Sequence, residues 1–457
     1  MPRKSPPIVS ETRFGHSLDE LRSLAGDVLA HARKAGASDC EVDVSESFGQ
    51  SVTVRRGEVE TIEYNRDKGI GVTVYLDRRK GYASTSNITA TALRETVEAA
   101  LAIARHTAED ACAGLPEEEL LAGHEQGFAD LDLYHPWSLS VEAAVDLARR
   151  CEQAAFAVSP LVTNSEGATV SIQEGQFIAA NSLGFMGGYP TSQHGLSCSV
   201  IAGKGEGMQR DDWYSTARDP EGIASPEAIG DYAARRALSR LGPRRIKSCK
   251  APVLFEAPLA AALIASFVHA ASGGALYRKT SFLVDCLGKR VFPAAVRIDE
   301  RPHLPGALAS SMFDNDGVAT RDRAVVAKGE LLGYFLSAYT ARKLGLATTG
   351  NAGGCHNLIV RPGKEDFQGL IRKMGRGLLV TELLGHGINY VTGDYSRGAA
   401  GYWVEDGEIR HAVEEITIAG NLRNMFLDIA AVGNDVLVRG SRQVGSILVG
   451  EMRIASG

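Results

Sequence analysis

The chain has 457 residues, seven of them cysteines, and a formal net charge of -6 at neutral pH. This length exceeds what one hydrophobic core usually organises, so we expect two or three domains. Hydrophobic residues make up 44% of the sequence and charged residues 23%, which excludes a fibrous or wholly disordered chain. Lysine and arginine are scattered along the chain, so we expect no nucleic-acid partner.

The sequence also lacks the segments of a secreted or membrane protein. No apolar stretch follows the first dozen residues, as a signal peptide requires. The longest apolar stretch, residues 257–271, contains Ser266 and His269 and is shorter than the roughly 20 residues that span a bilayer. The cysteines include no close pair of metal or redox type. We therefore expect a cytoplasmic protein with reduced thiols and no membrane partner.

The first half of the sequence predicts an α+β arrangement. Apolar residues recur at helical spacing over 17–35, and Ser17 with Glu20 forms a capping-box pair at the start of this helix. Alternating apolar and polar residues then predict an antiparallel meander, whose strands are expected at 40–44, 51–55, 59–64, 69–75 and 81–84. Further helices are expected at 91–105 and 141–157. The fold class is therefore α+β, with an N-terminal antiparallel sheet and helices packed on it.

Strand patterns return between residues 162 and 216, and an amphipathic helix follows over 226–241. Gly242-Pro243 ends this helix and marks a domain boundary. After it, residues 252–255 predict a buried strand, and residues 257–271 predict a helix that is apolar on nearly every side and therefore central.

The rest of the chain consists mostly of short predicted strands with glycine-rich connections and one amphipathic helix over 367–374. We expect three regions, an N-terminal α+β region (1–125), a second part of the N-terminal domain built of helix, strands and helix (126–243), and a β-rich C-terminal domain with one central buried helix (244–457).

The residues alone show no complete catalytic set. Zinc hydrolases of the thermolysin kind need two histidines one helical turn apart, but no two of the eleven histidines lie closer than eleven residues. The segment from Gly195 to Ser199 lacks the second glycine of a serine-hydrolase turn. Cys355 and His356 are neighbours in an extended segment, so their side chains point to opposite faces and do not pair.

Two C-terminal segments carry a family resemblance. Residues 377–387 read Gly-Leu-Leu-Val-Thr-Glu-Leu-Leu-Gly-His-Gly, and residues 392–398 read Thr-Gly-Asp-Tyr-Ser-Arg-Gly. These segments closely resemble the PmbA branch of the TldD/PmbA metallopeptidase family. Shorter matching blocks lie at 277–283, 342–346, 415–422 and 432–435, and the resemblance runs from the first meander to the last strand.

The resemblance implies an intracellular peptidase built from two related subunits, which enclose a cavity for extended, unfolded peptides. A TldD-like partner supplies zinc, held by a His-Glu-x-x-x-His helix and a cysteine near the C-terminus. When the motif is placed by the glycine and arginine residues that follow it, its second histidine falls on His269, its first on Ile264 and its glutamate on Ala265. No cysteine follows Cys355. This subunit is therefore expected to have no catalytic residues and no metal of its own.

Two glycine-rich segments are candidates for peptide binding. One contains Gly353, Gly354 and His356, and the other contains Asp394 and Arg397. Exposed strand edges at these segments would bind a peptide by strand addition. For Asp394 and Arg397, a structural ion pair beside a tight turn is an equal alternative.

Other interpretations remain open at this stage. For His269 we favour a structural histidine at a helix end, bonded to a nearby carbonyl. The chain as a whole is alternatively a self-sufficient homodimeric metalloprotease, with a metal site that draws on His269, His356 or His386. A third alternative is a regulatory binding protein without proteolytic activity. The sequence does not distinguish a homodimer from a heterodimer with a TldD-like subunit.

Overall fold

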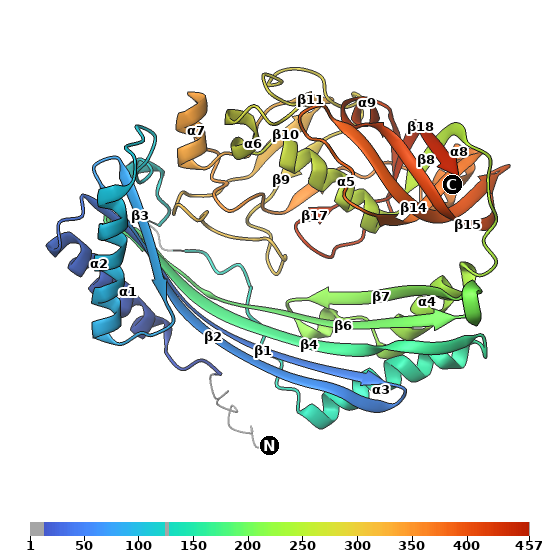
Figure 1. Cartoon of the computed structure of the whole chain (residues 1–457), viewed down its shortest axis with the longest axis horizontal. Helices are drawn as coiled ribbons and strands as arrows, with labels where there is room; N and C mark the ends of the chain where they lie inside the picture. The colour runs from blue at the N-terminus through green and yellow to red at the C-terminus, as the bar shows by residue number, and fades with distance from the viewer. Residues whose placement is uncertain (1–12, 124–127, 457) are drawn as a thin grey trace, which may run out of the picture.

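A long antiparallel sheet forms the first half of the molecule in the computed structural model, which describes residues 13–123 and 128–456. The strand order is β3-β2-β1-β4-β6-β7, with the short β5 paired to β4. The strands are β1 (Asp39–Arg55), β2 (Glu58–Leu76), β3 (Arg79–Thr85), β4 (Val162–Asn181), β5 (Met186–Gly187), β6 (Pro190–Ala202) and β7 (Gln209–Ala217). Figure 1 shows that the sheet is curved and that its concave side faces the second half of the chain.

The predicted antiparallel sheet is confirmed, but the predicted division of its strands is wrong. The segments expected at 40–44 and 51–55 belong to the single strand β1, and those expected at 59–64 and 69–75 belong to β2. The polar residues Glu46 and Gln50 interrupt the apolar alternation of β1, yet both are buried on the helix-covered face. Glu46 accepts hydrogen bonds from His16 and Gln176, which satisfies its buried carboxylate.

Helices cover the convex face of this sheet (Figure 1). They are α1 (Leu18–Lys34), α2 (Ala90–His106), α3 (Val141–Val158) and α4 (Pro226–Ser239), with 3-10 turns η1 (Glu118–Leu120), η2 (Gly205–Gly207) and η3 (Pro220–Gly222). The capping box of Ser17 and Glu20 is present at the start of α1. Helices α1 and α2 pack over Val42 and Val44 of β1, and α3 and α4 pack over Val52 and Val54.

The second half is rich in β-structure, as predicted. Its strands are β8 (Cys249–Phe255), β9 (Ile298–Glu300), β10 (Arg323–Ala327), β11 (Glu330–Leu331), β12 (Leu358–Val360), β13 (Gly377–Leu384), β14 (Asp394–Glu405), β15 (Glu408–Asn421), β16 (Ile429–Val432), β17 (Arg442–Gln443) and β18 (Ile447–Ser456). One sheet has the order β11-β10-β9-β12-β17. The other has the order β15-β14-β13-β8-β18-β16, and an additional pairing of β15 with β18 closes it into a ring. A closed ring leaves few free strand edges.

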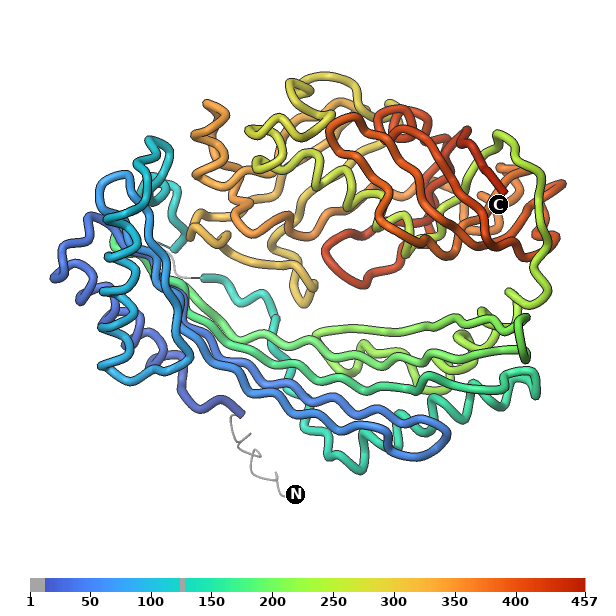
Figure 2. Tube along the Cα trace, viewed as in Figure 1, coloured from blue at the N-terminus to red at the C-terminus, as the bar shows by residue number. Residues whose placement is uncertain are grey.

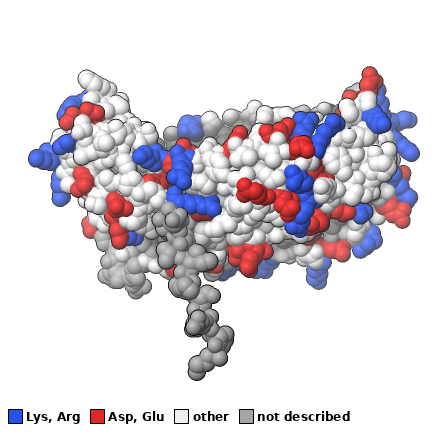
Figure 3. All heavy atoms as spheres, turned by 90° about the horizontal axis from the view of Figure 1, so that it is seen from below, with Lys and Arg blue, Asp and Glu red and all other residues white. Residues whose placement is uncertain are grey.

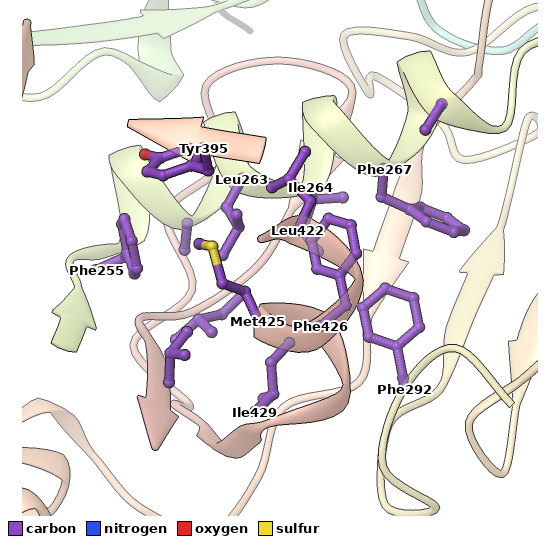
Figure 4. Packing of buried hydrophobic residues seen from close by; sticks show 14 of the residues in the cluster. Phe255, Leu263, Ile264, Phe267, Phe292, Tyr395, Leu422, Met425, Phe426 and Ile429 are labelled. Atoms are coloured by element: carbon purple, nitrogen blue, oxygen red, sulfur yellow. The ribbon is translucent and has the colours of Figure 1, made fainter. Parts of the chain in front are cut away.

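Helix α5 (Ala257–Ala270) is the central buried helix of this half, as predicted. Ile264 and Phe267 on α5 are 1% and 0% exposed. Figure 4 shows both side chains among Met425, Phe426 and other residues of the main core cluster. The remaining helices are α6 (Gly273–Tyr277), α7 (Ala338–Leu344), α8 (Phe367–Met374) and α9 (Leu422–Leu427).

The chain passes from the first half to the second after α4, at the end of the molecule opposite α1 and α2 (Figure 2). Strands from the predicted regions 1–125 and 126–243 share one sheet, and their expected boundary falls outside the described residues. Every helix in the described part of the chain is too short or too polar to span a bilayer. All seven cysteines are free thiols.

Candidate functional site

A row of open cavities follows one face of β1, on the side that the helices leave uncovered. The cavities have volumes of about 780, 620 and 420 Å³. Glu41 lines the first, Asp43 and Ser45 line the second, and Ser47 and Gly49 line the third. Because alternate residues of a strand point to the same face, these side chains belong to one continuous surface of the sheet.

This surface is made largely of small and polar side chains. The neighbouring strands add side chains to the third cavity, namely Asn65, Asp67, Gln173, Gly175, Thr191 and Gln193. Serine, threonine, asparagine and glutamine can all donate and accept hydrogen bonds. Such a surface suits a ligand with many backbone amides and carbonyls and offers little to a compact apolar molecule.

Carboxyl groups gather where the sheet meets the second half of the chain. Burial and the nearby Asp316 raise the pKa of Glu41 to about 7, although Lys80 and a hydrogen bond from Tyr75 oppose the shift. Burial and Asp316 also raise the pKa of Asp314 to about 7. Near neutral pH these two carboxyls are therefore partly protonated, and a protonated carboxyl donates a hydrogen bond as well as accepting one.

His356 lies away from this surface, beside the buried carboxylate of Glu300. Its Nδ1 is 3.1 Å from Glu300 Oε1, and its backbone N–H donates to the same oxygen at 2.8 Å. Arg323 Nε donates to the other oxygen at 2.6 Å, and Asn351 donates to Oε1 at 2.7 Å. Burial raises the pKa of Glu300, but the hydrogen bond from His356 and the charge of Arg323 outweigh it and bring this pKa down to about 2. This arrangement gives His356 a structural role.

Gly353 and Gly354 form an exposed turn that Glu300 helps to hold through Asn351, which donates to the Gly354 carbonyl at 3.0 Å. Both glycines have positive φ angles, 98° and 125°, which other residues rarely adopt. A Cβ at Gly353 would also lie 2.6 Å from the Asn315 side chain. The turn therefore requires glycine and stays close to the segment around Asp314.

Asp394 and Arg397 lie on β14 and do not form an ion pair with each other among the described residues. Asp394 accepts hydrogen bonds from Thr392 at 2.6 Å and from Asn421 at 3.2 Å. Arg397 donates to the Leu383 carbonyl at 3.5 Å. The predicted alternative of a structural ion pair is therefore wrong, because each side chain has other partners.

The expectation of a free strand edge at the segment of Asp394 and Arg397 is also wrong. Gly398 pairs with Leu384 of β13 on one side and with Thr417 of β15 on the other. A peptide cannot add a strand where both sides are already paired. No hydrogen bond or ion pair among the described residues joins the Asp394 segment to the Gly353–Gly354 turn.

The motif positions on α5 do not converge on one point. Ile264 faces the core, Ala265 is partly buried and His269 is exposed. The ring of His269 stacks on Tyr390 with centroids 4.1 Å apart, and the expected hydrogen bond from this ring to a carbonyl is not found among the described residues. His386 is exposed on the loop after β13. The three histidines of the alternative metal site thus occupy different surroundings.

These residues do not fit a zinc ion. Ile264 and Ala265 have no donor atoms in their side chains, and zinc sites in enzymes use three protein ligands. No group of three or more His, Cys, Asp or Glu side chains in the described ranges is arranged to hold a metal ion. Among the described residues, the motif positions on α5 therefore offer no ligand set for zinc.

Sequence reasoning missed side chains that join the two halves. Phe313 lies in an aromatic cluster with Phe177, Phe185 and Tyr189 from the first half, at centroid distances of 6.1, 5.0 and 5.8 Å. Arg218 donates to the carbonyls of Ala307 and Leu308 at 3.0 and 2.9 Å. Phe313 and Arg218 lie outside the helices and strands, so no periodic pattern points to them.

On the face seen in Figure 3, lysine and arginine side chains lie among aspartate and glutamate side chains and form no single broad basic area.

Three domain models of one family match the chain in order. They are described as the PmbA/TldA metallopeptidase domain 1 (residues 40–104), central domain (134–241) and C-terminal domain (248–456). The chain is also 46% identical over 438 residues to a protein named metalloprotease PmbA from Escherichia coli O157:H7, covering 96% of each chain. The chain belongs to the PmbA/TldD metallopeptidase family. The resemblance stated from residues 377–398 is thereby confirmed.

Further members of the PmbA/TldD family are similar along nearly the whole chain. A metalloprotease PmbA homolog from Haemophilus influenzae is 44% identical over 437 residues, covering 95% of this chain and 96% of that protein. A metalloprotease TldD homolog from the same strain is 22% identical over 430 residues, covering 89% and 87%. The crystal structure of a putative modulator of DNA gyrase from Bacteroides thetaiotaomicron superposes with a TM-score of 0.91 at 26% identity, covering 96% and 99%.

Proposed function

We propose that this chain is a non-catalytic subunit of a cytoplasmic PmbA/TldD-type zinc metalloprotease. It completes a peptide cavity together with a TldD-like partner, which carries the zinc ion. The substrates are small unfolded peptides that the complex degrades or matures. In isolation the chain forms a homodimer, and with the partner it forms a heterodimer.

This proposal rests on the residues that occupy the zinc-motif positions on α5. A hydrolytic zinc site needs ligands for the metal and a base for the bound water, and the positions of the first histidine and the glutamate hold Ile264 and Ala265. Ile264 is also part of the main core cluster, where a polar ligand would be desolvated. The side chain at this position therefore stabilises the fold and contributes nothing to hydrolysis.

The existence of two family members in one organism supports the proposed partner. Haemophilus influenzae has both a PmbA homolog at 44% identity to this chain and a TldD homolog at 22% identity. Two related proteins that persist side by side are consistent with two different roles in one assembly. The zinc-bearing role falls to the TldD-like member in this proposal.

The polar surface along β1 supports the proposed substrate class. Three cavities in a row, with volumes of about 780, 620 and 420 Å³, suit an extended chain better than a compact ligand. In the second half, the exposed Gly353–Gly354 turn, which Glu300 holds through Asn351, provides backbone groups for the peptide, and His356 lies beside it. The side chains of Asp394 and Arg397 on β14 are the second proposed contact, because the backbone of this strand is already paired on both sides.

The test is a cleavage assay on an unfolded peptide with this chain alone, a TldD-like subunit from the same cell alone, and both together. We expect cleavage only in the mixture, and its loss on addition of a chelator. A partner whose motif glutamate is replaced by glutamine is the matched control, because it retains the interface and removes the base.

The other outcomes identify the alternatives. Chelator-sensitive cleavage by this chain alone would support a self-sufficient homodimeric metalloprotease, and a zinc content near one equivalent per chain would agree with it. Binding of the partner without any cleavage by the mixture would support a regulatory binding protein.

A further inference from the structure

The second of the three cavities along β1 is lined by a carboxylate and two aromatic rings. It has a volume of about 620 Å³ and lies on the concave side of the sheet, which faces the second half of the chain (Figure 1). Asp43 of β1 supplies the carboxylate, and Tyr82 of β3 and Phe177 of β4 supply the rings. The ladder registers place all three side chains on the same face of the sheet. Because the strand order is β3-β2-β1-β4, Asp43 lies between the two rings.

Glycines leave the space around this carboxylate open. Gly71 of β2 lies directly opposite Asp43 in the ladder, and Gly69 is the next residue of β2 on the same face. A Cβ on Gly71 would lie 2.6 Å from Asp43 Oδ2 and 3.1 Å from the Tyr82 hydroxyl oxygen. The carboxylate and the ring therefore both approach the backbone of Gly71, and a side chain at this position would displace them. The two glycines leave room for a side chain of another molecule beside Asp43.

Asp43 has no counter-charge among the described residues. Burial raises the pKa of its carboxyl, and no hydrogen bond or cation in the described part of the chain offsets this shift. Lys68 also lines the cavity, but it lies opposite Glu46 in the ladder, so its side chain leaves the sheet on the helix-covered face. The Asp43 side chain is nevertheless accessible from the cavity. A carboxylate that is unpaired and partly removed from water attracts a cation more strongly than one in open solvent.

We propose that this cavity binds the side chain of a lysine or arginine residue of an unfolded peptide, with its positive charge against Asp43 and its methylene groups against Tyr82 and Phe177. The Tyr82 ring is 53% exposed, and an aromatic face attracts a cation. The stems of lysine and arginine also pack well on apolar surface. This inference rests on the proposed function for the presence of a peptide along β1, and it adds a preference for a basic residue at one position of that peptide.

A single carboxylate suits a cation carried by a side chain better than a bare metal ion. Calcium and magnesium ions need several oxygen ligands, and in the described ranges no group of three or more His, Cys, Asp or Glu side chains is arranged to hold a metal ion. Glu41, the neighbouring acidic residue on this face of β1, has a pKa raised to about 7 and is partly protonated at neutral pH. The charge of Asp43 is therefore the main attraction for a cation in this cavity.

The experiment measures the binding of dye-labelled peptides to the full chain by fluorescence anisotropy, at low salt so that charges are not screened. The host peptide consists of glycine, serine and asparagine, which keep it unfolded, and its central residue is lysine, arginine, norleucine or citrulline. Norleucine and citrulline are the uncharged counterparts of lysine and arginine. We expect the lysine and arginine peptides to bind at least about fivefold more tightly than their uncharged counterparts.

Substitutions test whether Asp43 is responsible. Asp43→Asn retains the shape of the side chain and removes its charge, so the preference should fall to within about twofold while the norleucine peptide binds as before. Gly71→Ala should also reduce the preference, because its Cβ would displace the Asp43 carboxylate. Asp146→Asn is the matched control, since Asp146 is exposed on α3 and its replacement should leave the preference unchanged. Circular dichroism confirms that each variant is folded.

Equal binding of charged and uncharged peptides, or no measurable binding of any of them, overturns the proposal. A preference that persists in Asp43→Asn also overturns it, because another acidic group is then responsible. A gain for only one of the two basic residues supports it and identifies the side chain that fits. Cleavage by the mixture with a TldD-like subunit, without a basic preference here, would leave the proposed function intact. A basic preference without cleavage by that mixture would contradict only the proposed function.

Discussion

The buried carboxylate of Glu300 helps to hold the Gly353–Gly354 turn of the second half in place. Its side chain is 2% exposed and receives hydrogen bonds from Arg323, Asn351 and His356. Because its pKa is lowered from 4.5 to about 2 in the folded state, it stabilises the fold by about 3 kcal/mol above its unfolded pKa. This contribution is lost as the pH falls from about 4.5 towards 2.

We therefore predict that Glu300→Gln lowers the free energy of unfolding by about 3 kcal/mol at pH 7, since it leaves Arg323 buried without its counter-charge. The difference between variant and wild type should shrink as the pH falls below 4. Urea denaturation at pH 7, 4 and 3 measures it. Glu451→Gln is the control, because Glu451 and Lys250 form an exposed pair that contributes close to nothing. Equal losses for both variants, or a loss independent of pH, would contradict the role given to Glu300.

At the level of single residues the sequence predicted little of this site. His356 stands out in the sequence as a candidate, but its partner Glu300 lies 56 residues away. Hydrogen bonds over such distances depend on how β9 and β12 pair, and no local pattern encodes that pairing. Spacing along the chain therefore identifies the histidine and misses its function.

Helices were predicted more accurately than strands, and the reason is physical. Helix α8 matches its expected range of 367–374, and α1 begins at the predicted capping box, because caps and 3.6-residue periodicity are local signals. The prediction divided β1 in two because the buried polar residues Glu46 and Gln50 break its apolar alternation. It divided β2 because the exposed polar residues 65–68 interrupt the pattern, although the backbone continues. The pairing of β1 with β4 and the pairing of β15 with β18 join segments that are far apart in the sequence. Only the three-dimensional structure reveals these pairings.

The close packing of α3 against α4 predicts that a larger residue at their contact destabilises the fold. Gly230 on α4 lies so near α3 that an added Cβ would be 2.0 Å from the Cys151 carbonyl oxygen. Gly230→Ala should therefore push the helices apart and lower the free energy of unfolding by about 2 kcal/mol. Thermal denaturation followed by circular dichroism measures the loss.

The matched control is Gly26→Ala on α1, where nothing lies within 4 Å of an added Cβ. Because alanine favours a helix interior over glycine, this variant should gain about 0.5–1 kcal/mol. A lower free energy of unfolding for Gly230→Ala and a higher one for Gly26→Ala would support the close packing of α3 against α4. A neutral Gly230→Ala would mean that the two helices can move apart without cost.

On the scale of the whole molecule, the two halves are joined by specific contacts as well as by the chain between α4 and β8. Arg236 of α4 forms ion pairs with Asp211 and Glu256 at 3.0 and 2.9 Å. On the opposite side of the cleft, Arg218 and the cluster around Phe313 hold the second half against the sheet. These contacts hold the second half beside the cavities along β1, the surface that binds a peptide in the proposed function.

Among these contacts, a substitution of Arg218 tests most directly how the two halves are joined. Arg218 is 9% exposed, and it donates to Ser192 and Leu133 in the first half as well as to Ala307 and Leu308 in the second. Burial lowers the pKa of Arg218, which shows that its charge is poorly solvated, yet its hydrogen bonds to carbonyls keep it in place.

We predict that Arg218→Ala removes a hydrogen-bond donor from four carbonyl groups, of which Leu133 keeps the Ser192 N–H, and releases the segment 302–311 from the sheet. Amide hydrogen exchange should then rise in residues 131–135 and 302–311, including the Gly306 amide that donates to the Leu131 carbonyl. Exchange in β10 should stay unchanged, because β10 lies within a sheet of the second half. Arg235→Ala is the control, since Arg235 is exposed and pairs only with Asp231 on its own helix. A rise in exchange throughout the second half would mean that Arg218 stabilises the whole fold of that half. No rise anywhere would mean that the aromatic cluster around Phe313 holds the two halves together without Arg218.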